Sequence, residues 1–295
     1  MAAQELVERL GNDYKDGIFV GTIHALAAKF LVEAGCFTEF NESVENEEFD
    51  QLFEECKKLD NLEGRYSYIF LDEAQDTSKI ELNFIFDILR AKRYFIAFDT
   101  NQTIYQFKGS NPKELISRLK SMNFIRYTLP ENFRNGRKIL NYGKWILKKQ
   151  GIMDWSIPAR PIDGELITNF YLKETLNYIR RDGDYKNWAF LCRTNKQIET
   201  IGYFMDRLGI PYNSFKQGEI TKAQLEEKME APCVKLLTIH SSKGLGFKKV
   251  AVYGALWYQE DEIYLNYVAA TRAMDTLIWI KKETYGKTFS YGGRR

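Results

Sequence analysis

Short apolar stretches rich in β-branched and aromatic residues alternate along this chain with segments of helical periodicity. This alternation restricts the fold more than any other feature, because it is typical of parallel sheets covered by helices on both faces. The stretches that predict strands are GIFVGT, YSYIFLD, RYFIAFD, FIRYTL, GELITNFY, NWAFLCR, VKLLTIH, KVAVYGAL and TLIWIKK. The segments that predict helices include HALAAKFLVEAG, SKIELNFIFDILRAK, NPKELISRLKSM and NKQIETIGYFMDRLG. The expected fold class is therefore α/β.

Two domains of similar size are expected, because 295 residues suffice for two hydrophobic cores. Gly, Pro and Asp interrupt both periodicities within residues 147–165, which divides the chain into domains 1–150 and 151–295. No run of 18 apolar residues occurs, and the first residues lack the apolar centre of a signal peptide. A cytoplasmic protein without membrane association is expected.

The four cysteines and the net charge bear on two kinds of site, a metal centre and a nucleic-acid surface. The cysteines lie far apart with no paired spacing, and only two histidines accompany them, so buried free thiols are favoured over a zinc or iron–sulfur site. The net charge is +2, so a nucleic-acid partner would require a local basic patch.

The segment YIFLDEAQD, residues 68–76, delivers adjacent carboxylates directly after a predicted strand. In a nucleotide hydrolase one such carboxylate, here Asp72, holds Mg²⁺, and the next, Glu73, polarises water. The alternative is that these acids only cap the following helix, which begins with a capping box formed by Ser78 and Glu81.

A second strand also ends in a carboxylate, in FIAFDTNQTIYQFKGSNP at residues 95–112. Asp99 is followed by Gln102, and a polar side chain at a strand end can sense a phosphate. Tyr105 and Phe107 lie beside a lysine, and exposed aromatic rings next to a cation can stack on bases. The alternative for both rings is packing in the core.

Three further segments carry polar residues next to predicted strands or helices. Phe133 and Arg134 precede a helix in YTLPENFRNGRKIL, and Arg272 lies between a helix and a strand in YLNYVAATRAMDTLIWI. In LLTIHSSKGLGFKKVAVYG, residues 240–243 follow a strand and could offer backbone N–H groups to an anion. An isolated arginine is more commonly a solvated surface charge.

In this order, the five segments resemble the second to sixth motifs of the UvrD/Rep-like helicases of superfamily 1. GTIHALA at residues 21–27 resembles the family's Gly-Thr-Phe-His-Ser segment. The resemblance implies two RecA-like domains of the P-loop NTPase type, with ATP in the cleft between them. It also implies an ATP-dependent DNA helicase or translocase that moves 3′ to 5′ on single-stranded DNA or on DNA with a single-stranded tail.

The resemblance assigns catalytic roles to matching residues. Asp72 would hold Mg²⁺, Glu73 would activate the attacking water, and Gln102 would sense the γ-phosphate of ATP. Arg134 and Arg272 would act as arginine fingers, which stabilise the charge that develops on the transferred phosphoryl group.

The remaining assignments concern the nucleotide and the nucleic acid. Phe133 would stack on adenine, and Gly244 would belong to the nucleotide site. The family's Gly-Leu-Glu-Phe is here Gly244-Leu245-Gly246-Phe247, so the carboxylate expected near the ribose is absent. The residues expected to face DNA are Thr22, His24, Tyr105, Phe107, His240 and Lys243.

The phosphate-binding loop of these enzymes, Gly-x-x-x-x-Gly-Lys-Ser/Thr, does not occur in the 295 residues. AAQELVERLG at residues 2–11 resembles the end of the motif that follows this loop, so the chain is expected to be truncated or split just downstream of it. The intervals between motifs are short, and the family's large inserted domains are therefore expected to be absent or much reduced.

Two alternatives stay open beside an incomplete helicase motor. One is a catalytically inactive remnant that binds single-stranded DNA, which the missing loop and Gly246 favour. The other is one half of a split helicase whose loop is carried by a second polypeptide. A simple binding module has no need of the catalytic candidates, so their presence favours a motor; they are Asp72, Glu73, Gln102, Arg134 and Arg272.

Overall fold

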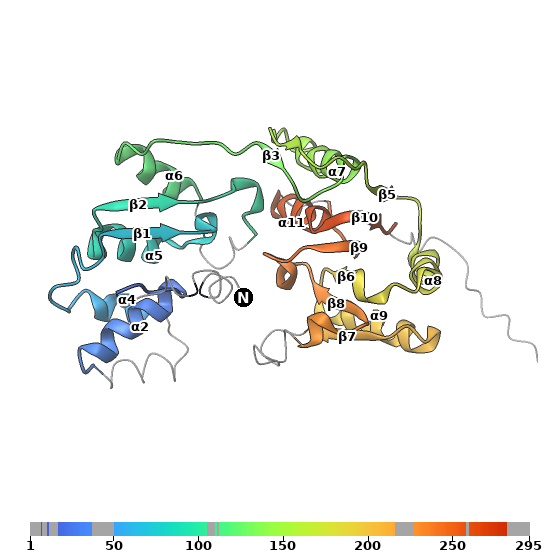
Figure 1. Ribbon diagram of the computed structural model, residues 1–295, viewed down its shortest axis with the longest axis horizontal. Coiled ribbons are helices and arrows are strands. Elements are labelled where there is room, and N and C mark those ends of the chain that lie inside the picture. The colour runs from blue at the N-terminus through green and yellow to red at the C-terminus, as the bar shows by residue number, and fades with distance from the viewer. Residues whose placement is uncertain are drawn as a thin grey trace, which may run out of the picture. The chain divides into compact units, whose positions relative to one another are not determined.

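The computed structural model describes residues 7, 11, 17–36, 50–104, 110, 112–215, 227–257 and 260–281. The chain divides into two compact units, Met1–Tyr127 (unit 1) and Thr128–Arg295 (unit 2). Each unit combines helices with parallel strands, so the expected α/β class with parallel sheets is confirmed (Figure 1).

The division lies before the 150/151 boundary expected from the sequence, because helix α7 (Arg137–Lys148) belongs to unit 2. A Cβ added to Gly143 of α7 would lie 3.3 Å from Cγ2 of Thr271 at the end of helix α11 (Glu260–Thr271). The hydroxyl of Tyr267 in α11 also donates to Oδ2 of Asp154 at 3.0 Å. The interruption at residues 147–165 is therefore a connection inside unit 2.

Unit 1 contains a two-stranded parallel sheet with helices beside it. Its strands β1 and β2 pair in register, with Phe70 opposite Phe95. The described elements of unit 1 are α2 (Ile23–Glu33), α4 (Gln51–Cys56), β1 (Tyr68–Leu71), η2 (Ala74–Asp76), α5 (Lys79–Asn83), the π-helix η3 (Phe84–Leu89), β2 (Arg93–Ile96), η4 (Thr100–Gln102) and α6 (Pro112–Ser121).

One face of this sheet carries the core of unit 1. Ile69 and Tyr94 pack against a buried cluster supplied by α2, α4 and η3. On the opposite face, the side chains of Tyr68, Phe70 and Phe95 are 53%, 73% and 53% exposed, and the two phenylalanine rings stack 4.8 Å apart. Cover on both faces, expected from the alternation, is therefore not found for this sheet among the described residues.

Unit 2 contains a six-stranded, all-parallel sheet in the order β5-β10-β9-β6-β8-β7. A separate pair joins β3 and β4. The elements of unit 2 other than α7 and α11 are β3 (Glu131–Asn132), β4 (Ile157–Pro158), β5 (Glu165–Ile167), α8 (Leu172–Asp182), η6 (Tyr185–Asn187), β6 (Trp188–Cys192), α9 (Asn195–Leu208), β7 (Tyr212–Phe215), β8 (Val234–Thr238), η7 (His240–Ser242), β9 (Phe247–Tyr253) and β10 (Ala273–Trp279).

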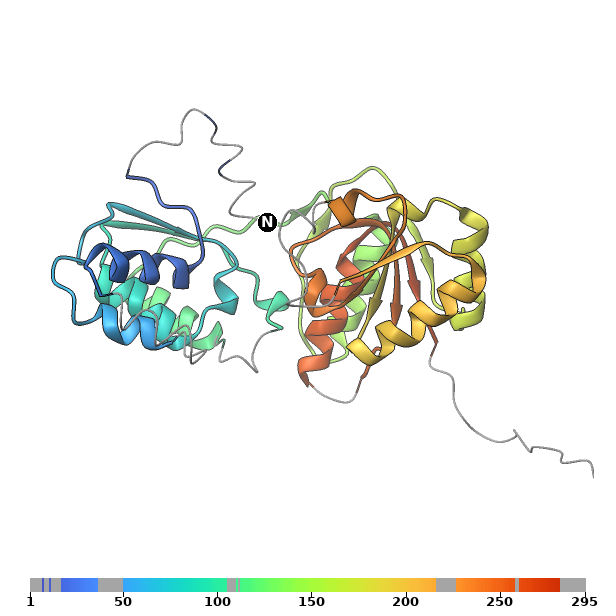
Figure 2. The ribbon, with the colours of Figure 1, turned by 90° about the horizontal axis from the view of Figure 1, so that it is seen from below.

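Helices cover both faces of the larger sheet. On one face, Ile179 of α8 and Ile201 of α9 join Trp188 and Phe190 of the central strand β6 in one buried cluster. Figure 2 shows α8 and α9, in yellow, on this face and α11, in orange-red, on the other. Burial on both faces explains why β6 is apolar at every position rather than alternating.

Two predicted strands are absent, and three short strands were not predicted. GIFVGT is irregular and ends in Thr22, which caps α2. FIRYTL spans the junction of the units without a strand partner, and Tyr127 and Leu129 are 84% and 94% exposed. The capping box of Ser78 and Glu81 is confirmed, whereas β3, β4 and β7 carry too few apolar residues to be recognised in sequence.

The helices within the described ranges are all too short or too polar to cross a membrane. The cysteines are free thiols, and Cys56, Cys192 and Cys233 are buried as expected, while Cys36 is partly exposed.

Candidate functional site

The acidic residues predicted in unit 1 meet at one edge of its sheet. Asp72 and Glu73 directly follow β1, and Asp99 follows β2. Because the strands are parallel, both sets lie at the carboxyl edge. The N–H of Ala74 donates to the carbonyl of Ala97 at 3.0 Å and ties the two strand ends together.

A chain of hydrogen bonds joins the two predicted motifs at this edge. Nε2 of Gln75 donates to Oε2 of Glu73, and the N–H of Asp99 donates to Oε1 of Gln75 at 3.0 Å. Nε2 of Gln102 donates to Oδ2 of Asp99 at 2.8 Å. The side chain of Gln75, at the centre of this connection, is fully buried. Gln75 was not predicted as a site residue, and its only signal in the sequence is its place between two motif acids.

Glu73 has a backbone conformation that is rare for a residue with a side chain. Its φ is +51°, in the left-handed region, which costs about 1–2 kcal/mol. The N–H of Glu73 donates to Oδ1 of Asp72 at 2.9 Å, and the N–H of Asp76 donates to the carbonyl of Glu73 at 3.0 Å. Strain of this kind concentrates at functional positions.

At the carboxyl edge of the sheet in unit 1, Asp72 could bind Mg²⁺ only together with a phosphate ligand. The carboxylate of Asp72 is exposed, and only its Oδ1 accepts a hydrogen bond from the described residues. In the described ranges, no three His, Cys, Asp or Glu side chains gather to hold a metal. Mg²⁺ commonly binds one or two carboxylates together with substrate phosphates and water, and Asp72 fits that arrangement.

In unit 2, the predicted arginine Arg272 is 1% exposed. It lies between α11 and β10, as expected. Its Nη1 donates to the carbonyl of Leu245 at 2.9 Å, and its Nε donates to the carbonyl of Val268 at 3.3 Å. These two bonds hold the buried guanidinium against backbone carbonyls of the loop before β9 and of α11.

Asn135 fixes the backbone on both sides of Arg272. Its buried Nδ2 donates to the carbonyls of Thr271 and Ala273, at 3.0 and 2.6 Å. The residue adjoins Arg134, so one side chain connects the segments that carry the two predicted arginines. Sequence reasoning missed this contact, because it joins positions 136 and 138 residues apart.

Phe133 and Arg134 project from a turn that Asn132 organises. Oδ1 of Asn132 accepts the N–H of Arg134 at 3.1 Å and that of Asn135 at 2.9 Å. The ring of Phe133 is 68% exposed, so it is available to stack on a base, and Arg134 is exposed as well.

The DNA-facing candidates of unit 1 have contacts of their own. Oγ1 of Thr22 accepts the N–H of Ala25 at 3.1 Å and caps α2. The ring of His24 lies 4.8 Å from the ring of Phe53, and its Nδ1 lies 3.5 Å from Oε1 of Glu81. Two further candidates, Tyr105 and Phe107, lie outside the described residues.

Backbone N–H groups in the loop after β8 donate to oxygen atoms of the same loop, contrary to the expectation that they would bind an anion. The N–H of Ser241 donates to Oγ1 of Thr238 at 3.1 Å, and that of Lys243 donates to the carbonyl of His240 at 3.2 Å. The N–H groups of residues 242 and 245 are also bonded within the loop. His240 and Lys243 are partly exposed, and Gly244 is exposed with φ of +79°.

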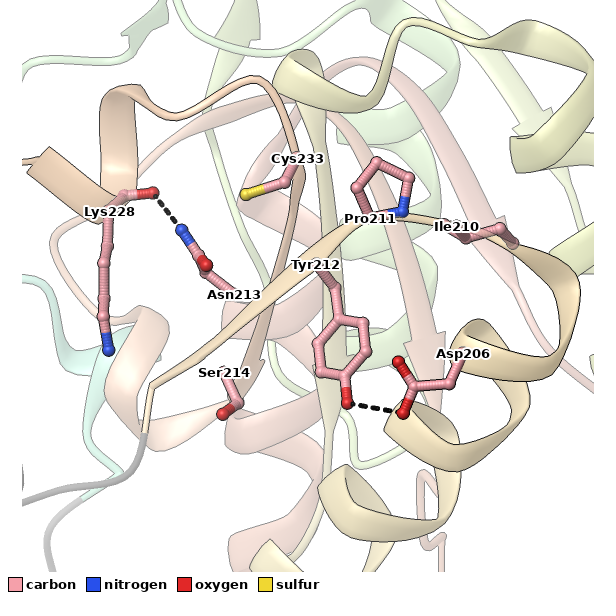
Figure 3. Close-up of a pocket in the computed structure, with 8 residues that line it drawn as sticks. All are labelled: Asp206, Ile210, Pro211, Tyr212, Asn213, Ser214, Lys228 and Cys233. Atoms are coloured by element: carbon pink, nitrogen blue, oxygen red, sulfur yellow. Dashed lines mark hydrogen bonds between the residues drawn. The ribbon is translucent and has the colours of Figure 1, made fainter.

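A polar hollow of about 550 Å³ lies elsewhere in unit 2, beside the edge strand β7 (Figure 3). The hydroxyl of Tyr212 donates to Oδ2 of Asp206 at 3.3 Å, and Nδ2 of Asn213 donates to the carbonyl of Lys228 at 3.2 Å. Burial raises the pKa of Tyr212 and of the Cys233 thiol, so both stay protonated near neutral pH. None of the candidate residues lines this hollow.

Comparison with known protein families gives two matches. The model of the UvrD/REP helicase N-terminal domain matches residues 47–123, and that of the UvrD-like helicase C-terminal domain matches residues 216–284. Among solved structures, the C-terminal domain of a possible DNA helicase from Lactobacillus covers 50% of this chain and 88% of its own, with 19% identity and a TM-score of 0.35.

Three curated relatives have similar sequences over part of this chain. The mitochondrial ATP-dependent DNA helicase HMI1 of Saccharomyces cerevisiae is 26% identical over 182 residues, which are 53% of this chain and 26% of HMI1. The ATP-dependent DNA helicase PcrA of Staphylococcus aureus is 24% identical over 55% of this chain and 24% of PcrA. DNA helicase II of Haemophilus influenzae is 26% identical over 53% of this chain and 23% of its own length. The matches thus span about a quarter of these relatives.

Proposed function

Segments of the chain match the N-terminal and C-terminal domains of UvrD/Rep-like helicases, so the chain belongs to that family, and on this premise we propose that it is the motor core of an ATP-dependent DNA helicase. The proposed substrate is single-stranded DNA, or duplex DNA with a single-stranded tail, along which the motor moves 3′ to 5′. ATP and Mg²⁺ are the proposed cofactors, and the cytoplasm is the proposed location.

The observation that carries this proposal is the hydrogen-bond chain from Glu73 through Gln75 and Asp99 to Gln102. It holds a general-base candidate and a phosphate-sensing candidate in a fixed relation at one sheet edge. A change in what Gln102 contacts can therefore reach Glu73 through a buried glutamine. The strained backbone of Glu73 supports the same assignment.

The proposed roles follow from the position of each side chain. Asp72 would hold Mg²⁺, which would neutralise charge on the phosphates, and Glu73 would accept a proton from the attacking water. In unit 2, the exposed ring of Phe133 would stack on adenine, and Gly244 would adjoin the nucleotide. Arg134 and Arg272 would stabilise charge on the γ-phosphate.

A DNA-binding protein without ATP turnover is the second candidate, and a specific observation favours it. No phosphate-loop sequence occurs in the 295 residues, so we expect the chain by itself to bind ATP weakly or not at all. If a second polypeptide carried the phosphate-binding loop, weak ATP binding by this chain alone would be compatible with the presence of the motor residues.

Hydrolysis of ATP tests the motor proposal once a phosphate-loop segment is joined to the N-terminus. Release of phosphate should then rise when single-stranded DNA is added. Glu73→Gln should abolish turnover and preserve nucleotide binding, because the amide cannot act as a base. Arg272→Ala should lower the rate on the order of 10³-fold.

The matched control is Glu63→Gln, which alters an exposed glutamate of unit 1 that pairs with Arg90. Its hydrolysis rate should equal that of the parent. Undiminished hydrolysis by the Glu73→Gln protein would remove Glu73 from the catalytic role.

A further inference from the structure

Gly246 lies directly beside Arg134, although 112 positions separate them in sequence. A Cβ built on Gly246 would lie 3.8 Å from Nε and 3.9 Å from Cδ of Arg134. Any side chain at position 246 would therefore contact this arginine, and glycine leaves that side of it uncovered.

The backbone does not require glycine at position 246. Unlike Gly244, whose φ is +79°, Gly246 is outside the left-handed region. The atom that would approach its Cβ most closely is Cε of Met274, at 2.7 Å, and this is the flexible end of a side chain. A larger residue can be accommodated, so the effect of glycine here is on the surroundings of Arg134.

Arg134 forms no salt bridge with an acidic residue in the described part of the chain, whereas Arg137 pairs with Asp163 and Arg160 pairs with Asp275. The neighbouring Arg160 donates from Nη1 to the carbonyl of Arg134 at 2.7 Å, while its Nη2 pairs with Oδ1 of Asp275 at 2.9 Å. The charge of Arg160 is therefore offset, and that of Arg134 remains available.

We propose that Gly246 sets the affinity of Arg134 for anions, by leaving its guanidinium open to the phosphate groups of a nucleotide. The inference rests on the proposed function for the identity of the anion. A carboxylate at position 246 would pair with Arg134 and compete with phosphate oxygens. An uncharged side chain of the same size would occupy the space without competing.

The test compares the parent with Gly246→Glu and its uncharged match Gly246→Gln. Phenylglyoxal modifies accessible arginines, and peptide mass spectrometry gives the rate at Arg134 with and without inorganic tripolyphosphate. Tripolyphosphate should protect Arg134 in the parent and in the Gln variant. In the Glu variant, half-protection should need about fivefold more tripolyphosphate, the upper range for one exposed ion pair.

Arg207 of α9 serves as the reference in the same digest, and it should show no protection. Equal protection in the Glu and Gln variants would overturn the proposal, as would protection of Arg134 no stronger than that of Arg207. Binding of single-stranded DNA by the same proteins is measured in parallel. If no single-stranded DNA is bound, the proposed function is refuted. The protection of Arg134 in the Glu and Gln variants tests the role of Gly246 independently of that result.

Discussion

Replacement of Gln75 by leucine should destabilise unit 1 and leave unit 2 unchanged. Leucine fills a similar volume, but it removes the donor to Glu73 and the acceptor for the N–H of Asp99. The carboxylate of Glu73 is exposed and regains water, whereas the partly buried N–H of Asp99 loses its partner. An unsatisfied buried donor costs about 1–3 kcal/mol, so the free energy of unfolding of unit 1 should fall by ~2 kcal/mol.

The cysteines allow each unit to be followed in the same sample. Cys56 lies in the core of unit 1, and Cys192 is buried in β6 of unit 2. Burial raises the pKa of the Cys56 thiol to about 12, so it should resist labelling while unit 1 is folded. Pulsed thiol labelling across a urea series then yields one unfolding midpoint for each unit.

In the Gln75→Leu protein, the midpoint at Cys56 should fall by about 1 M urea, since a domain of this size loses ~2 kcal/mol of stability per molar urea. The midpoint at Cys192 should not move. Gln51→Leu provides the matched control, because Gln51 is an exposed residue of unit 1 and its replacement should change the stability of unit 1 by less than about 0.5 kcal/mol. A Cys56 midpoint equal to that of the parent would refute the role given to Gln75.

Two further predictions concern unit 2, which contains all five tryptophans, so its unfolding can be followed by their fluorescence. Asn135→Ala removes the donor to the carbonyls of Thr271 and Ala273 and should cost about 1–3 kcal/mol; an unchanged midpoint would show that water replaces the amide. Gly244→Ala should cost about 1–2 kcal/mol because φ is +79° there, and Gly246→Ala should cost less; equal losses would contradict the difference in backbone requirement.

Local chemistry in the sequence predicts those parts of the fold that depend on neighbouring residues. The capping box at Ser78 and the αL glycine that ends α9, Gly209, are examples of such features. The strand ends that bear Asp72 and Asp99 were predicted for the same reason. Parallel pairing then brings these two ends to one edge.

Contacts between distant segments were not predictable from one sequence. The two hydrogen bonds from Asn135 join the turn before α7 to the α11–β10 junction, and the buried Arg272 donates to a carbonyl in the loop before β9. The exposure of a segment was not predictable either. FIRYTL alternates like a strand, yet no strand pairs with it. After β8, the N–H groups of residues 241, 242, 243 and 245 bond within their own loop. Periodicity in a sequence shows which side chains share one face of a helix or strand. It does not show whether another element covers that face.

Binding of single-stranded DNA tests the central claim most directly, through the fluorescence anisotropy of a short labelled oligonucleotide at several salt concentrations. Affinity should fall with salt, and Phe107→Ala should weaken binding for every base composition, because stacking contributes ~1–3 kcal/mol per base. Lys243→Gln should lower the salt slope by about one. The control Lys186→Gln, at an exposed lysine before β6 that pairs with Glu230, should bind like the parent. If the parent shows no salt-dependent binding, or Lys243→Gln matches Lys186→Gln, the proposed helicase function is contradicted.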